Sequence, residues 1–349
     1  MNARGVGRFA VFICFALLAG QQLPAQSPGY HVVKTLPVGG EGFWDYLTAD
    51  GTGGRLYVSR GSHVMVIDMA SMKVVGDIPN TNGVHGIAIA TEFNRGFTSD
   101  GGDTTATIFD LKTLQTISKV PVTGAGPDAI LYDPFTKRAF TMNHSGGSAT
   151  AIDAATGKVV GTAAIGGILE TGQSDNAGTI YVNVESKSEI AAFDARTMAV
   201  KAHWPLTGCE GPSGLAIDRE HGRLFASCGE SHTMDVMDYH TGRIVATLPI
   251  CVGTDAAGFD PGLQLAFASC GDGSITAVHE DSPDKFTVVQ TITTERGART
   301  MAVDETTHKL YTVTAQFGPQ PAAVPGETRR RRPPMIPGSF HVLVVDRQD

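Results

Sequence analysis

A short apolar segment that ends in aspartate recurs along the chain at nearly constant spacing. Five clear copies place successive aspartates 42, 43, 41 and 44 residues apart: VMVID (64–68), ATIFD (106–110), ATAID (149–153), IAAFD (190–194) and MDVMD (234–238). Two degenerate copies, at 275–281 and 340–346, bring the number to seven. A period of roughly 20 to 50 residues is typical of a solenoid, a propeller or another array of repeats.

Each clear copy is followed, three residues after its aspartate, by a serine or a threonine. The pairs are Asp68–Ser71, Asp110–Thr113, Asp153–Thr156, Asp194–Thr197 and Asp238–Thr241. Asp, Ser and Thr side chains accept hydrogen bonds from backbone N–H groups just ahead of them. The spacing therefore predicts a hairpin turn after each copy.

Three further kinds of segment recur in register with the first. One is apolar and in most copies ends in Asp: WDYLTAD (44–50), VHGIAIA (84–90), PDAILYD (127–133), LETGQSD (169–175), PSGLAID (212–218), TDAAGFD (254–260) and ARTMAVD (298–304). The second is of the type RLYVSRG and RLFASCG, and the third of the type KVVGDIP and RIVATLPI. All are short, rich in Val, Ile, Thr, Phe and Tyr, and bounded by Gly, Asp or Pro, which favours strands.

Four short antiparallel strands per unit of about 42 residues indicate an all-β fold, the β-propeller. The last unit lacks its fourth strand, because only RQD follows residue 346. An unassigned strand of that type, HVVKTLPV (31–38), lies near the start of the chain. We therefore expect one domain, residues 26–349, forming a seven-bladed propeller of four-stranded blades whose ring is closed by the N-terminal strand.

Residues 1–25 read as a secretory signal peptide. Arg4 and Arg8 precede an apolar run from Phe9 to Ala19, and a polar stretch ends at a small residue, Ala25. Cleavage there removes two basic and no acidic side chains, so the formal net charge changes from -8 to -10. The sequence thus predicts a periplasmic or extracellular protein with no transmembrane segment after cleavage, and its acidity argues against nucleic acid as a partner.

Four cysteines remain in the mature chain, an even number that favours disulfides in an exported protein. Cys209 precedes the first strand of the fifth unit and Cys228 ends its second strand; Cys251 and Cys270 take the same places in the sixth. These positions adjoin in an antiparallel pair, so we predict the bonds Cys209–Cys228 and Cys251–Cys270. The alternative, a cysteine metal site, usually has closer spacings such as C-x-x-C.

The segments LYVSRG (56–61), IYVNVES (180–186) and LYTVTA (310–315) resemble the tyrosine-valine-threonine-asparagine (YVTN) repeat propellers, a group of exported seven-bladed β-propeller proteins. The resemblance runs through residues 30–346, although no copy spells the motif in full: Tyr57 and Val58 lead to Ser59 and Arg60. It implies the fold and export. Members of the group look like binding or surface proteins more often than enzymes, and some relatives of the fold are metal-dependent lactonases or cofactor-dependent dehydrogenases.

The chain has no G-x-S-x-G, H-E-x-x-H, phosphate-loop, EF-hand or C-x-x-C-H motif. A propeller binds ligands at the mouth of its central channel, and the second residue of each first strand is placed to face it. We call these seven residues the channel ring: Asp45, His85, Asp128, Glu170, Ser213, Asp255 and Arg299. Arg60, Asp100, Asn143 and His144, at the ends of second strands, could form an outer shell on the same face.

The channel ring allows three interpretations. Its carboxylates suit a divalent cation such as calcium, or zinc if His85 takes part, with Asp128, Glu170 and Asp255 as further ligands. Two carboxylates of divergent pKa could instead perform acid/base catalysis. The third interpretation is that polar residues solvate a water-filled channel and that Arg299 balances the acids. No catalytic residue is assigned.

Residues 316–338 interrupt the last unit with six prolines and the run Arg329, Arg330, Arg331 and Arg332. This composition predicts an exposed loop insertion rather than a strand or helix. Connectivity places it on the face of the channel ring. It could dock an acidic partner or polysaccharide, or it could be a solvated loop.

The sequence thus favours an exported, monomeric binding or interaction protein with a ligand or partner site at the channel face. The partner would be a small ligand, an envelope or extracellular protein, or a polysaccharide. The alternative is a metal-dependent, lactonase-like hydrolase that uses the same ring. A third hypothesis is a scaffold protein of the cell envelope.

Overall fold

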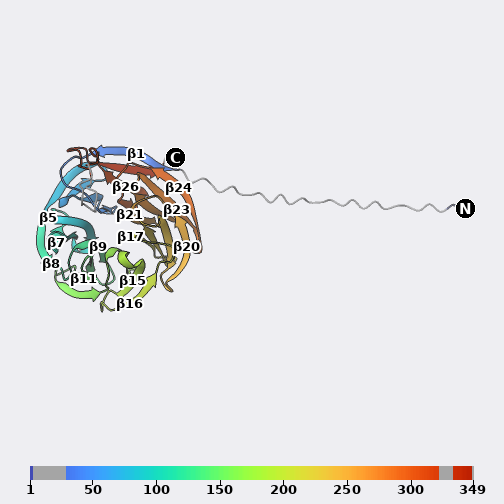
Figure 1. Ribbon diagram of the computed structural model, residues 1–349, viewed down its shortest axis with the longest axis horizontal. Helices are drawn as coiled ribbons and strands as arrows, with labels where there is room; N and C mark the ends of the chain where they lie inside the picture. Colours follow the sequence, from blue (N-terminus) through green and yellow to red (C-terminus); the bar gives the residue numbers. More distant parts are fainter. Residues whose placement is uncertain (3–28, 322–332, 348–349) are drawn as a thin grey trace.

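The computed structural model describes residues 1–2, 29–321 and 333–347. The signal-peptide prediction and the four-arginine run fall on residues outside these ranges. The described chain is all-β, built of five four-stranded antiparallel sheets and one seven-stranded sheet in a propeller-like arrangement around a common centre (Figure 1).

Four of the sheets each consist of four consecutive strands. They are β9 (Pro127–Asp133), β10 (Arg138–Asn143), β11 (Ser148–Asp153) and β12 (Val159–Ala164); β13 (Leu169–Ser174), β14 (Thr179–Val184), β15 (Glu189–Asp194) and β16 (Val200–Pro205); β17 (Pro212–Asp218), β18 (Arg223–Cys228), β19 (Thr233–Asp238) and β20 (Arg243–Pro249); and β21 (Thr254–Asp260), β22 (Leu265–Cys270), β23 (Ser274–Ser282) and β24 (Lys285–Thr293). Two short 3-10 helices, Thr91–Phe93 and Glu185–Lys187, lie in turns.

The seven-stranded sheet contains two consecutive repeats. Its strands are β2 (Leu47–Asp50), β3 (Arg55–Ser59), β4 (Gly61–Asp68), β5 (Lys73–Ala90), β6 (Arg95–Asp100), β7 (Thr105–Asp110) and β8 (Thr116–Pro121). The first half of β5 pairs with β4 and its second half pairs with β6. The sequence predicted two strands here; they are instead continuous, and Gly61 also pairs with Val84 at the crossing point.

The sixth sheet joins the two ends of the chain. It contains β25 (Met301–Asp304), β26 (Lys309–Thr314), β27 (His341–Arg347) and, beside β27, the N-terminal strand β1 (Tyr30–Pro37). Tyr30 pairs with Arg347 and Pro37 with His341, so β1 takes the edge position that β12 or β16 fills in other sheets. Figure 1 shows β1 running along the rim beside the C-terminus.

The five hairpin turns predicted from the Asp and Ser/Thr spacing are confirmed. In each, the Ser or Thr backbone N–H donates to the aspartate carboxylate, at 2.7 Å in the turns of Asp68 and Asp153, 2.8 Å in those of Asp110 and Asp194, and 3.2 Å in that of Asp238. These bonds anchor the outer hairpin of each repeat.

The core lies between neighbouring sheets. Phe140 of β10 packs edge-on against Phe193 of β15 at 6.0 Å, and Phe225 of β18 stacks on Phe259 of β21 at 5.2 Å. Burying these rings between the faces of adjacent sheets fixes each sheet against its neighbour.

Both expected disulfides are present. Cys209–Cys228 and Cys251–Cys270 have Cα–Cα distances of 5.4 and 5.8 Å, and each joins cysteines 19 residues apart. Two disulfides indicate an oxidising environment outside the cytoplasm. Among the described residues, no helix has the length and apolarity needed to cross a membrane.

Candidate functional site

Five of the channel-ring residues lie at β-bulges, four of them near the start of a strand and His85 within the long strand β5. The register with the second strand skips between Val84 and Ile87, around His85, and likewise around Asp128 in β9, Glu170 in β13, Ser213 in β17 and Asp255 in β21. A bulge leaves a residue unpaired and redirects its side chain. The repeat therefore turns one side chain per bulged strand out of the ladder.

Polar side chains of the second strands hold this irregular backbone in place. The Ser99 hydroxyl accepts the Gly86 N–H at 2.9 Å and donates to the Asp128 carbonyl of the next sheet. The Asn183 amide donates to the Ser213 carbonyl at 3.1 Å, and the Ser269 hydroxyl to the Arg299 carbonyl at 2.7 Å. Because these bonds cross between sheets, they fix the ring residues relative to one another.

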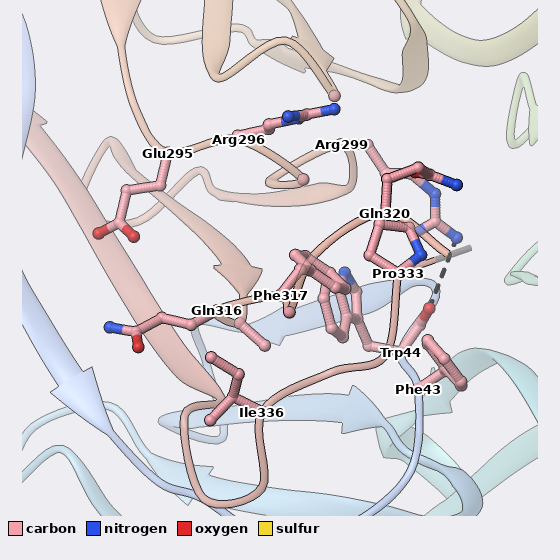
Figure 2. Close-up of a pocket in the computed structure, with 14 residues that line it drawn as sticks. Phe43, Trp44, Glu295, Arg296, Arg299, Gln316, Phe317, Gln320, Pro333 and Ile336 are labelled. Atoms are coloured by element: carbon pink, nitrogen blue, oxygen red, sulfur yellow. Dashed lines mark hydrogen bonds between the residues drawn. The ribbon is translucent and has the colours of Figure 1, made fainter. Parts of the chain in front are cut away.

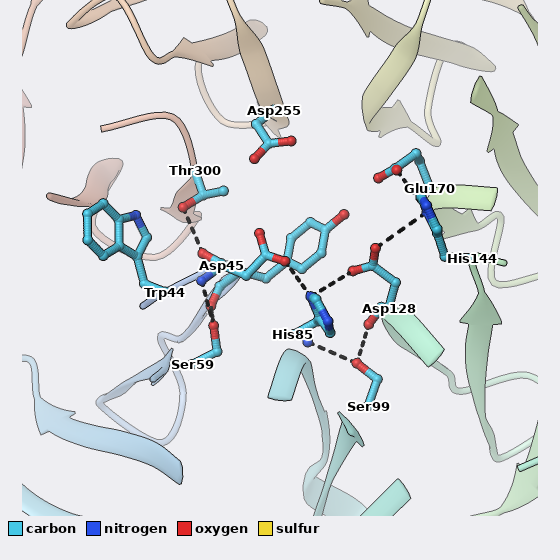
Figure 3. Close-up of polar contacts among 12 residues, drawn as sticks. Trp44, Asp45, Ser59, His85, Ser99, Asp128, His144, Glu170, Asp255 and Thr300 are labelled. Atoms are coloured by element: carbon cyan, nitrogen blue, oxygen red, sulfur yellow. Dashed lines mark hydrogen bonds and ion pairs between the residues drawn. The ribbon is translucent and has the colours of Figure 1, made fainter. Parts of the chain in front are cut away.

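One half of the ring is an alternating chain of carboxylates and imidazoles (Figure 3). The Nδ1 atom of His85 lies 2.6 Å from Asp45 Oδ2 and 3.4 Å from Asp128 Oδ1. The Nδ1 atom of His144 lies 3.6 Å from Asp128 Oδ2 and 3.1 Å from Glu170 Oε1. Asp128 thus bridges the two histidines.

The other half of the ring is closed by arginine. Arg299 pairs with Asp255 at 2.6 Å and with Asp45 at 3.2 Å, and the Ser213 hydroxyl donates to Asp255 Oδ1 at 3.0 Å. Polar contacts therefore connect six of the seven ring residues in one chain, from Ser213 through Arg299 to Asp128. His144 links Asp128 to the seventh, Glu170.

The pKa values in this cluster are shifted toward the protonated forms. Burial, and after it the nearby Asp45 and Glu170, raise the pKa of Asp128 to about 8, although both histidines oppose this. The hydrogen bond to Glu170 raises the pKa of His144 to about 9. Burial also raises the pKa values of Glu170 and Asp255. Four carboxylates facing one arginine leave an excess of negative charge that holds protons or would attract a cation.

Two groups of ligand atoms suit a metal ion. Asp45, His85 and Asp128 form one and Asp128, His144 and Glu170 the other, with the ligand atoms of each group within 4.8 Å of one another. Asp128 belongs to both, and its buried Oδ1 accepts no hydrogen bond from the described residues. A buried carboxylate that has one oxygen without a hydrogen bond and an imidazole nitrogen near each oxygen offers the ligand types of a divalent-cation site.

Tyr46, the residue after Asp45, reaches from the first repeat to the fourth, a feature that the sequence analysis missed. Its hydroxyl lies 3.3 Å from the Thr171 hydroxyl of a distant repeat, and its ring packs against the core of the β9–β16 sheets. Burial and four ring carboxylates raise its pKa well above the usual value. The signal was present: the corresponding residues of the other repeats are Gly86, Ala129, Thr171, Gly214, Ala256 and Thr300, all small.

Of the four predicted outer-shell residues, only His144 contacts the ring. Arg60 is fully buried, donates to the carbonyls of Gly39, Glu41 and Gly42, and lies 3.5 Å from the centre of the Phe340 ring. Asp100 accepts hydrogen bonds from Thr98 and Thr107, and Asn143 from Thr141 while donating to Ser148 and Thr150. These three side chains are buried away from solvent, where they support the loops and strands.

A cavity of about 830 Å³ adjoins the ring (Figure 2). Arg299 lines it and also pairs with the ring carboxylates. Phe43, Trp44, Phe317, Pro333 and Ile336 give it apolar walls, and Glu295 and Arg296 add charge. The walls include both described ends of the 316–338 insertion, which pair with each other through Phe317 and Met335. The cavity has the size and lining of a small-molecule site.

The sequence matches no protein-family model, and no curated protein is significantly similar to it.

Proposed function

We propose that the protein is an exported, seven-bladed β-propeller of the YVTN-repeat type that binds a divalent cation in its channel ring and a small organic ligand in the adjoining cavity. In this proposal β5 supplies one strand to each of two blades, and β1 completes the seventh. The protein acts as a monomeric binding protein in the periplasm or outside the cell.

One observation carries the proposal: two overlapping groups of carboxylate and imidazole atoms share Asp128, whose buried Oδ1 accepts no hydrogen bond from the described residues. The nearby His85 Nδ1, 3.4 Å away, is hydrogen-bonded to Asp45 at 2.6 Å instead. A purely structural ring would pair each carboxylate with its own donor. Water solvation of an open channel fits poorly, because the Tyr46 side chain reaches across from the first repeat to Thr171 of the fourth.

The ligand set favours zinc over calcium. Calcium takes six to eight oxygen ligands, whereas His85 and His144 contribute nitrogen atoms next to Asp45, Asp128 and Glu170. Asp255, which the sequence analysis included as a ligand, is paired with Arg299 at 2.6 Å and is better suited to hold that arginine toward the cavity.

The test is thermal unfolding of the mature, metal-stripped protein with zinc, manganese, calcium or magnesium added back. An ion that binds only the folded state stabilises it by about 2.7 kcal/mol at a hundred times its dissociation constant. We expect the zinc-dependent shift to shrink in Glu170→Gln. The matched control is Glu189→Gln, whose carboxylate pairs with His203 at 2.7 Å away from the ring and should leave the shift unchanged. Equal shifts in wild type and Glu170→Gln would contradict the proposal.

A second function, metal-dependent hydrolysis of a lactone-like ester, is favoured by one observation. Arg299 faces both the ring and the cavity, so an anionic or polarised carbonyl group bound there would lie beside the ring. A general base and an activated water would both come from the ring. If the protein hydrolyses lactones, the wild type should turn them over and Asp128→Asn should abolish this activity. If the protein only binds its ligand, the wild type shows no hydrolysis, and Asp128→Asn weakens ligand binding alone.

The run Arg329–Arg332 supports a separate proposal about partners. Four guanidinium groups in an insertion whose described ends border the cavity would suit an acidic protein or polysaccharide of the envelope. If the protein is a scaffold, deletion of residues 316–338 should abolish its association with this envelope partner, whereas substitutions in the channel ring should not.

A further inference from the structure

A second cluster of metal-ligand type lies at the opposite ends of the strands from the channel ring. Ser213, the ring residue of β17, is near the start of that strand, and Asp218 is at its end. His221 lies in the turn that follows, and Glu280 comes from β23 of the next sheet. The cluster therefore spans two neighbouring sheets.

The three side chains converge on one imidazole nitrogen. His221 Nδ1 lies 2.7 Å from Asp218 Oδ2 and 3.1 Å from Glu280 Oε1, and the ligand atoms of all three lie within 4.8 Å of one another. A single Nδ1–H can donate to only one of the two carboxylates. Asp218 has other donors, the backbone N–H groups of Glu220 at 2.9 Å and His221 at 3.3 Å.

Glu280 is left without a donor. The residue is 4% exposed, and neither of its carboxylate oxygens accepts a hydrogen bond from any described residue. A buried carboxylate in this position is costly unless a cation or a proton neutralises it. Arg223 is close, but its guanidinium donates to the carbonyls of Pro283 at 2.7 Å and His221 at 2.8 Å.

The other repeats provide comparisons within the same chain. In two turns equivalent to that of Asp218, a threonine takes the place of His221, and Thr136 and Thr307 donate to Asp133 and Asp304. His308 Nδ1 lies 2.8 Å from Asp260, a simple histidine–aspartate pair that belongs to none of the metal-ligand groups in the described part of the chain. Among the described equivalent turns, that of Asp218 alone places one histidine against two acids, one of which accepts no hydrogen bond.

We propose that Asp218, His221 and Glu280 bind a divalent transition-metal ion such as zinc, which links the β17–β18 turn to β23. One imidazole and two carboxylates are ligands that zinc accepts, and two carboxylates neutralise its charge. The His221 side chain is 30% exposed, so the cluster is close to solvent on the side of this residue.

The experiment is equilibrium dialysis of the mature protein against zinc, with bound metal counted per chain. It uses an Asp128→Asn background, which removes the carboxylate shared by both ligand groups of the channel ring, so that the two sites are counted separately. We expect the background to retain one zinc per chain, and Glu280→Gln or His221→Thr to remove it. His221→Thr places in this turn the residue that Thr136 and Thr307 provide in folded repeats, which makes misfolding a poor explanation for the loss.

His308→Asn is the matched control, because it removes a histidine–aspartate pair without touching the cluster, and asparagine tolerates the left-handed backbone of this position, so the zinc count should stay at one. A second measurement replaces zinc with cobalt and records the visible absorption spectrum, which depends on the ligands of the ion. We expect His221→Thr to change this spectrum because it removes the imidazole ligand. The proposal is overturned if Glu280→Gln and His221→Thr leave the zinc count of the background unchanged, or if that background binds no zinc. Either result would mean that no zinc ion neutralises Glu280 in this cluster.

Discussion

At the residue scale, the proton-binding groups of the channel ring set a pH dependence. The pKa of His144 is raised from 6.5 to about 9, so its pairing stabilises the fold fully below pH 6.5 and this contribution is lost as the pH rises through 9. The pKa of Asp128 is raised from 3.8 to about 8, so the cost of ionising it in the folded state grows above pH 3.8 and is complete above about 8. Both effects act in the same direction.

We therefore expect the unfolding midpoint of the metal-free protein to fall as the pH rises from about 6.5 to 9. Saturating zinc should remove most of this slope, because the ion replaces the protons that the ring releases. Asp128→Asn combined with His144→Gln should flatten the same part of the profile. Differential scanning calorimetry across this range measures all three; a metal-free midpoint that rises with pH would contradict the assignment.

The sequence predicted which residues lie near one another in the ring but not how they pair. The repeat alignment placed Asp128 and Glu170 at equivalent positions, which is enough to put them on one face. It could not tell that His144, at the end of a second strand, reaches between them, because that depends on the bulge that shifts β9 against β10. The prediction of Arg60 as an outer-shell residue was wrong. Its guanidinium donates to carbonyls of the irregular segment 39–42, whose conformation the repeat pattern does not predict.

At the scale of elements, strand bounds follow closely from the repeat. PDAILYD (127–133), PSGLAID (212–218) and TDAAGFD (254–260) coincide with β9, β17 and β21, because each ends at an aspartate that begins a turn. The prediction of two strands between 73 and 90 was wrong in one respect. The residues between them, 80–83, continue the ladder, since Gly61 pairs with Val84 after the register shift.

Each disulfide fastens the first strand of a sheet to its second. Because both close loops between cysteines 19 residues apart, removing either one by paired Cys→Ala substitution should lower the free energy of unfolding by about 3 kcal/mol. The substitutions Cys209→Ala with Cys228→Ala, and Cys251→Ala with Cys270→Ala, are controls for each other. Urea denaturation under oxidising conditions measures both. A loss well below 1 kcal/mol from either pair would mean that the unfolded chain is already ordered in that loop.

At the scale of the whole molecule, the arrangement of sheets around a centre is what creates the site. No single repeat contains more than two residues of the pairing network, and each contact among Asp45, His85 and Asp128 joins successive repeats. The contacts of Arg299 with Asp45 join the last repeat to the first. The site therefore requires the last repeat to lie against the first, and we expect the pairing of β1 with β27 to hold the two together.

This dependence can be tested by moving β1. Tyr30 pairs with Arg347, so the start of β1 lies beside the end of β27, as the fourth strand lies beside the third in other sheets. A permuted chain that begins at Gly39 and carries residues 30–38 after Arg347, joined by a turn copied from residues 194–199, should fold as the parent does and keep its zinc-dependent stabilisation. A chain that begins at Gly39 and lacks β1 exposes the edge of β27 and should unfold at a much lower temperature and lose the shift. Both variants begin at Gly39, so they differ only in whether β1 is present. A difference between them therefore reports the loss of β1 and not the change of N-terminus. If the truncated chain kept the midpoint of the parent, closure by β1 would not be what holds Arg299 against Asp45.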